Sequence, residues 1–98
     1  MPIKADLIIF KQNAQFFKVF THPVRLEILN ILRNGEQCVC HLEASLGYRQ
    51  AYISQQLIVL KDSGIIEETR QVRNIFYKLA DMNALKVIDA LEPKVRQS

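Results

Sequence analysis

The sequence has few of the residues on which several common functions depend. Its 98 residues include only three glycines and two cysteines. No phosphate-cradling glycine loop is present, and no nucleophile, base and orienting group stand at a recognisable spacing. No run of 18 apolar residues occurs, although a membrane-spanning helix would need one. These absences argue against an enzyme and against a membrane protein.

The N-terminal residues and the cysteine count point to the same compartment. Residues 1–6 lack the apolar core and the cleavage site of a signal peptide, so we expect a cytoplasmic protein. In a reducing cytoplasm, two cysteines do not indicate a structural disulfide framework. The net charge of +3 favours a polyanionic partner.

The length and the apolar content together suggest self-association. A chain of 98 residues without repeats or linkers is one domain, residues 1–98, and it buries only a modest fraction of its surface. Its hydrophobic content of 49% is high for that size. Part of this apolar surface is therefore expected to form an interface between subunits.

Residues 50–63 have the spacing of an amphipathic helix. Ile53, Leu57, Leu60 and Lys61 recur at helical intervals, so the apolar stripe of this helix should face a core. The opposite face is predicted to carry uncharged side chains that donate and accept hydrogen bonds: Gln50, Tyr52, Ser54, Gln55 and Gln56. Glutamine can bind an adenine edge in the major groove, and no acidic residue stands between Glu43 and Asp62 to repel phosphate. This face is suited to contact DNA bases in the major groove. The alternative interpretation is a polar helix face that contacts only solvent.

Two short strand-like runs follow this helix. Residues 65–69 and 75–79 have the composition of strands. The turn between them holds Arg70 and Arg73, which could reach phosphates or a minor groove. Two helices joined by a tight turn and followed by such a hairpin predict a helix-turn-helix with a wing.

Helical spacing predicts four more helices, at residues 5–20, 23–33, 38–45 and 82–91. Pro23 suits a first helical position, Asp81 can cap the last helix, and Gly64 can end the 50–63 helix in the left-handed conformation. Pro93 should end or bend the last helix. The predicted fold is mainly α with a small β-wing, about five helices plus a two-stranded hairpin.

The helix predicted at residues 5–20 has two apolar stripes, and each needs a partner. One stripe consists of Leu7, Phe10, Ala14 and Phe17, and the other of Ile9, Phe16 and Phe20. One partner should be the body of the domain and the other, by hypothesis, a second subunit. We therefore expect a homodimer in which residues 1–20 and 82–98 contribute the dimerisation helices.

Three stretches resemble one family of regulators. Residues 46–66, LGYRQAYISQQLIVLKDSGII, resemble the recognition segment of the ArsR/SmtB family of bacterial and archaeal metal-responsive repressors. Residues 21–29, THPVRLEIL, resemble the family's second helix, and residues 35–42, GEQCVCHL, resemble the segment that carries thiolate ligands in its arsenic, lead and cadmium sensors. The likeness covers residues 16–79. It implies a winged helix-turn-helix homodimer that binds double-stranded operator DNA and is released by an inducer.

Cys38, Cys40 and His41 are the candidate ligands for such an inducer. Soft thiolates select As(III), Cd, Pb, Cu(I) or Zn over hard cations, and a helix N-terminus favours the thiolate. Cys38 and His41 are spaced i and i+3, on one helix face. Cys38 and Cys40 would point about 200° apart on a regular helix, so they could share one ion only where the helix start is distorted.

Several positions depart from the family pattern. Glu43 stands where the arsenic sensors often have a third cysteine, and no histidine follows Asp81 to build the zinc site of the family's terminal helix. Val72 stands where the wing turn commonly has glycine. Arg49 opens the recognition helix where serine is common, which exchanges a good N-cap for a phosphate contact.

Three interpretations of the function remain open. The first is a repressor released from its operator by a thiophilic metal or metalloid at Cys38 and Cys40. The second is the same repressor answering to thiol oxidation or persulfide, since two neighbouring cysteines can form a disulfide. The third is a winged-helix interaction module with no inducer, in which the cysteines only pack as small apolar residues.

Overall fold

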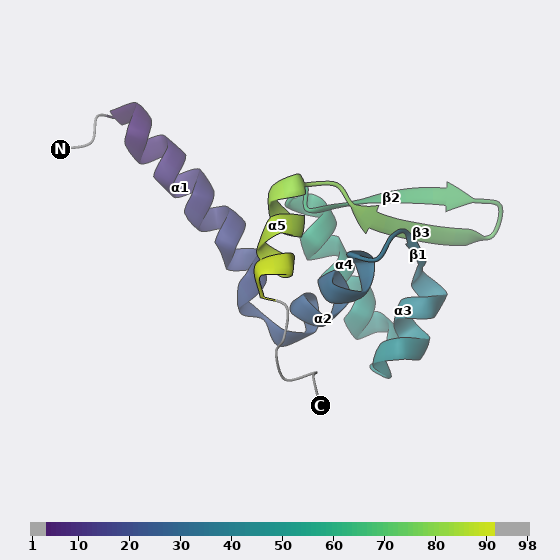
Figure 1. Cartoon of the computed structure of the whole chain (residues 1–98). Coiled ribbons are helices and arrows are strands. Elements are labelled where there is room, and N and C mark those ends of the chain that lie inside the picture. The colour runs from purple at the N-terminus through teal and green to yellow at the C-terminus, as the bar shows by residue number, and fades with distance from the viewer. Residues whose placement is uncertain (1–3, 92–98) are drawn as a thin grey trace.

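Helices make up most of the chain, as the sequence predicts (Figure 1). The computed structural model describes residues 4–91. In chain order the elements are α1 (Lys4–Lys18), the 3-10 helix η1 (Val19–Thr21), α2 (Pro23–Leu32), β1 (Gln37–Cys38), α3 (Val39–Leu46), α4 (Gln50–Asp62), β2 (Ile66–Gln71), β3 (Asn74–Leu79) and α5 (Met82–Ala90). The five helices and the hairpin β2–β3 confirm the predicted fold class.

The helices begin and end where local chemistry allows. The backbone N–H of Val24 donates to Nδ1 of His22 over 3.2 Å, which caps α2, and Pro23 follows the cap as the first residue of the helix. The Asp81 carboxylate accepts from the backbone N–H of Asn83 at 2.8 Å and caps α5. Gly64 follows α4 with a φ of +81°, as predicted. Pro93 lies outside the described residues.

The sheet has one strand more than the sequence indicates. β1 joins the hairpin to form a three-stranded antiparallel sheet in the order β1-β3-β2. The register pairs Gln37 with Tyr77 and Cys38 with Phe76. Cys38 is therefore extended and precedes α3, although the sequence predicts it as the first residue of that helix.

One apolar cluster holds α2 to α5 and the base of the sheet together. Its fully or nearly fully buried members include Ile28, Leu29, Leu42, Ile53, Leu57, Leu60, Ile65, Ile66, Ala84 and Ile88. Ile53, Leu57 and Leu60 of the stripe predicted for the recognition helix are buried, whereas Lys61 is exposed and pairs with Glu68 on β2. Burial of this stripe sets which face of α4 remains outside.

Helix α1 extends away from this body (Figure 1). Only its end near η1 joins the core, where Phe16 and Phe20 pack against the buried cluster. Leu7, Phe10 and Phe17 are 46%, 59% and 53% exposed. Large apolar side chains with this much exposure on one helix are typical of a protein interaction surface. Among residues 4–91, no helix is long and apolar enough to cross a membrane.

The wing tip contains the single non-glycine residue with positive φ in the described part of the chain. Val72 has a φ of +46° and its side chain is wholly exposed. It stands in the two-residue turn between Gln71 and Asn74, which pair across the hairpin. A β-branched residue is poorly suited to this conformation, which costs an L-residue about 1–2 kcal/mol.

We expect Val72→Gly to raise the free energy of unfolding by up to about 1 kcal/mol, because relief of the positive φ exceeds the added flexibility of the unfolded chain. Chemical denaturation measures this directly. Val72→Ala is the matched control, since it keeps the Cβ and should give no comparable gain. An equal gain from both variants would contradict backbone strain at the tip.

Candidate DNA interface and thiol site

Helix α4 presents most of its predicted polar face to solvent. Arg49, Gln50 and Gln55 are exposed, and Ser54 is half-buried. Arg49 has extended backbone angles before the helix and its side chain makes no capping hydrogen bond. These side chains are therefore placed to meet a ligand that approaches the N-terminal half of α4.

Gln56 does not belong to this face, so its predicted exposure is wrong. Its side chain is only 8% exposed, and its Oε1 accepts a hydrogen bond of 3.1 Å from Nη1 of Arg25. The Nε of Arg25 donates in turn to the carbonyl oxygen of Val19 at 2.9 Å. Arg25 thus ties α4 to η1 from its position on α2. Gln56 therefore helps to position the recognition helix, and its Oε1 is already engaged by Arg25.

Two tyrosines mark the N-terminal end of α4. The rings of Tyr48 and Tyr52 meet edge to face, with centroids 5.6 Å apart. The Tyr48 hydroxyl donates to Oε1 of Glu27 at 3.0 Å, and this bond to a carboxylate raises the pKa of Tyr48 above its ordinary value. Tyr52 was predicted from the sequence as a DNA contact, whereas no role was predicted for Tyr48.

His22 orients the second of these tyrosines. Its Nδ1 accepts from the backbone N–H of Val24, so a neutral ring carries its hydrogen on Nε2. Nε2 lies 3.2 Å from the Tyr52 hydroxyl and donates to it. The hydroxyl hydrogen of Tyr52 is then available to donate outward, for example to a phosphate oxygen.

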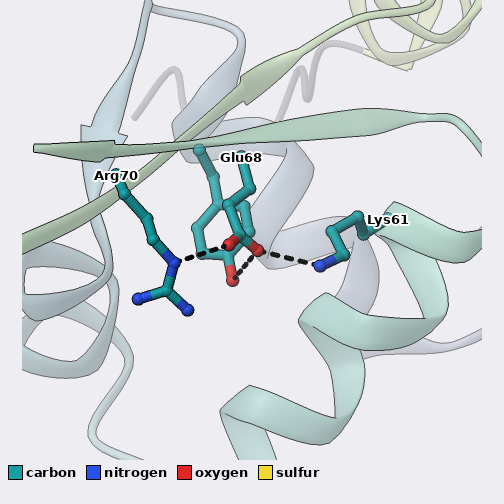
Figure 2. A network of polar contacts seen from close by, with 4 residues as sticks. Lys61, Glu68 and Arg70 are labelled. Atoms are coloured by element: carbon teal, nitrogen blue, oxygen red, sulfur yellow. Dashed lines mark hydrogen bonds and ion pairs between the residues drawn. The ribbon is translucent and has the colours of Figure 1, made fainter.

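A carboxylate joins α4 to the wing (Figure 2). Glu68 on β2 accepts from Nζ of Lys61 at 2.9 Å and from the hydroxyl of Tyr77 at 3.4 Å. Its other oxygen lies 3.5 Å from Nε of Arg70. The hydrogen bond from Lys61 lowers the pKa of Glu68, and the same bond raises the pKa of Lys61. Arg70, a predicted DNA contact, is thus partly engaged by Glu68, while Arg73 at the tip is exposed.

The two cysteines lie at the junction of β1 and α3, where a disulfide joins them. Their Cα atoms are 5.2 Å apart, because Cys38 is extended and the 200° separation of a regular helix does not apply. Sγ of Cys38 also accepts from the backbone N–H of Cys40 at 3.1 Å and so caps α3. Cys40 is exposed and Cys38 is half-buried.

His41 and Glu43 do not join the sulfurs. Nε2 of His41 lies 3.3 Å from the Ser45 hydroxyl, one turn along α3. Oε2 of Glu43 is buried without a hydrogen-bond partner in the structure. Within residues 4–91 no three or more histidine, cysteine, aspartate or glutamate side chains are grouped to hold a metal ion.

These elements define a winged helix-turn-helix domain of the DNA-binding type: α3, a turn and α4, followed by the hairpin β2–β3. Comparison with known proteins extends this class to a family. The family described as "Bacterial regulatory protein, arsR family" matches residues 22–68. The Biofilm growth-associated repressor of Xylella fastidiosa (strain Temecula1) is 42% identical over 78 residues, which are 80% of this chain and 68% of that protein. The chain belongs to the ArsR family of DNA-binding transcriptional regulators.

Solved structures agree with this assignment. The crystal structure of the transcriptional repressor BigR from Xylella fastidiosa superposes with a TM-score of 0.81 at 37% identity, over 93% of both chains. The homodimeric winged helix-turn-helix domain of Mb0332 from Mycobacterium bovis has a TM-score of 0.82 at 23% identity, over 93% of this chain and 84% of that one. The latter likeness concerns the fold alone.

The different surroundings of Gln55 and Gln56 generate a paired prediction. Gln55→Ala should leave stability unchanged and cost about 1–3 kcal/mol of discrimination between operator and altered sequences. Gln56→Ala should lower the free energy of unfolding by about 1–2 kcal/mol, because it leaves Nη1 of Arg25 without its acceptor. Denaturation and DNA-binding titrations on both variants test this. The reverse assignment of the two effects would contradict the orientation of α4.

Proposed function

We propose that the chain is a homodimeric transcriptional repressor whose affinity for operator DNA is set by the thiol state of Cys38 and Cys40. The disulfide at the start of α3 is the observation that carries this proposal. It joins the end of β1 to the first turn of α3, the first helix of the helix-turn-helix, and its exposed member, Cys40, is accessible to an oxidant or a reductant. The Xylella relative is a repressor, which supports repression as the direction of control.

The DNA-binding part of the proposal assigns two roles. Gln50, Ser54 and Gln55 would read base edges in the major groove, as the donor and acceptor groups of their side chains allow. Arg49, Tyr52, Arg70 and Arg73 would contact phosphates or the minor groove and set the position on the duplex. The net charge of +3 supports a polyanionic partner.

The direction of the response follows from the redox environment. A regulator inside the cell meets reducing conditions, so the dithiol would be the resting, operator-binding state. Oxidation removes two electrons and two protons and forms the Cys38–Cys40 disulfide, and a cellular thiol can reverse it by exchange. The oxidised protein would release the operator.

A thiophilic metal or metalloid is the second candidate inducer. The two sulfurs lie side by side at a helix N-terminus, which favours the thiolate and hence As(III), Cd, Pb or Zn. The described residues supply these two donors without a third protein ligand grouped beside them. The candidate donor set therefore fits incompletely, and His41 would have to leave Ser45 to complete it.

The exposed apolar side of α1 supports the dimer. Phe10 and its apolar neighbours have no covering element in the described chain, and Met82 and Leu91 at the two ends of α5 are 65% and 55% exposed. A two-fold arrangement would bury the same patches of both subunits and place two recognition helices about one turn of DNA apart. Ile88 of α5 lies in the core of the subunit and is not part of this exposed surface.

Redox control is tested by operator affinity, using DNA selected in vitro against the reduced protein. Oxidation with diamide should weaken binding by about 5- to 150-fold, the range of ordinary coupling free energies. Cys38→Ser and Cys40→Ser should bind like the reduced protein in every condition. Release of the reduced wild type by As(III) or Cd, lost in both variants, would favour the metal candidate. Serine variants that still respond to every treatment would exclude the cysteines as sensors.

The dimer is tested by sedimentation at micromolar concentration. Phe10→Asp should dissociate the protein, since a carboxylate would be buried without a partner at the interface. Gln12→Asp is the matched control, because it introduces the same side chain at an exposed polar position of α1. A monomeric wild type, or equal dissociation by both variants, would contradict an interface on the apolar side of α1.

A further inference from the structure

We infer that the thiol state of Cys38 and Cys40 is transmitted to the DNA-binding elements within each subunit, through strand β3 and the side chain of Glu68. The inference rests on the proposed function, because it names the route by which that switch acts. It does not require a change in the angle between two subunits. Each step of the route is a contact in the structure.

The first step is the position of Cys38. This residue is the last of β1, where it pairs with Phe76, and its sulfur caps α3. A bond between its sulfur and Cys40 therefore links the end of a strand to the first turn of a helix. Reduction by a dithiol adds two electrons and two protons, breaks the sulfur–sulfur bond and leaves two thiols, while the reductant becomes a cyclic disulfide. The backbone at the β1–α3 junction loses this constraint.

The second step crosses from β1 to β3. Gln37 precedes Cys38 and pairs with Tyr77, whose ring is buried in the common core. A two-residue strand has few hydrogen bonds to hold it, so its pairing is sensitive to the residue that ends it. A shift of β1 therefore acts on both of its partners in β3, on Phe76 through Cys38 and on Tyr77 through Gln37.

The third step leads from Tyr77 to both DNA-binding elements. The Tyr77 hydroxyl donates to Glu68, and the same carboxylate accepts from Lys61 on α4 and pairs with Arg70 on the wing (Figure 2). The side chain of Glu68 is only 19% exposed, so it holds these partners in a partly shielded position. Movement of Tyr77 would change the orientation of the wing relative to the recognition helix.

The neighbouring residue offers a matched control. Glu67 also lies on β2 and also pairs with a lysine, Lys78, at 3.3 Å. That pair joins β2 to β3 and makes no connection to α4. Glu67→Gln and Glu68→Gln remove the same charge one residue apart, so the change in net charge is matched between the two variants.

The experiment measures the ratio of operator affinities of the reduced and the diamide-oxidised protein. Glu67→Gln should keep the wild-type ratio, whereas Glu68→Gln should bring it to within about twofold of one. By linkage, operator DNA should also shift the midpoint potential of the Cys38–Cys40 pair in the wild type, by about 30 mV for each tenfold in the ratio. This shift should disappear in Glu68→Gln and persist in Glu67→Gln.

The possible results distinguish a failure of the inferred route from a failure of the proposed redox control. A wild-type ratio of one would overturn redox control and the route together. A normal wild-type ratio that Glu68→Gln retains would overturn the route alone. If thermal unfolding shows that Glu68→Gln is not folded, Lys61→Met against Lys78→Met decides the matter in the same way. Tyr77→Phe, which keeps the buried ring and removes only the hydroxyl, should reduce the ratio as well, and an unchanged ratio there would overturn the third step.

Discussion

The burial of one stripe of α4 is the constraint on which the DNA-binding surface depends. Ile53, Leu57 and Leu60 enter the same apolar cluster as residues of α2 and α3. Because side chains advance by about 100° per residue, this packing allows only one rotation of the helix. It places Gln55 outside and Gln56 inside, where Arg25 holds it. The polar face is thus a consequence of the core, and the wing is oriented on it through Glu68.

Features set by neighbouring residues were predictable from the sequence. The helix order, the caps at His22 and Asp81 and the left-handed Gly64 follow from local chemistry. Gln56 could also have been placed correctly, since it lies three residues after Ile53 and four before Leu60, on the buried stripe. Because glutamine is polar, Gln56 was grouped with the polar face and not with the apolar residues of the buried stripe. Its partner on α2 is 31 residues away, and no local pattern signals such a contact.

The surroundings of the thiols were the least predictable part of the site. β1 has two residues, too few for a periodic signal, and it exists only because β3 lies beside it. Without β1, Cys38 is naturally taken as helical, and a helical Cys38 cannot face Cys40. The extended backbone at Cys38, with φ −73° and ψ 148°, removes this obstacle. Long-range pairing therefore decides whether these two cysteines can react with each other.

A route inside the subunit has an energetic consequence for a dimeric repressor. If both recognition helices and both wings engage one operator, a weakening in each subunit contributes once per half-site, and the two contributions add. A total coupling of about 1–3 kcal/mol then needs only about half of that from each subunit. A change of this size requires no unfolding of the core, only a different orientation of the wing on α4. The buried cluster can remain intact while the Cys38–Cys40 junction, at the edge of the sheet, changes the fit to DNA.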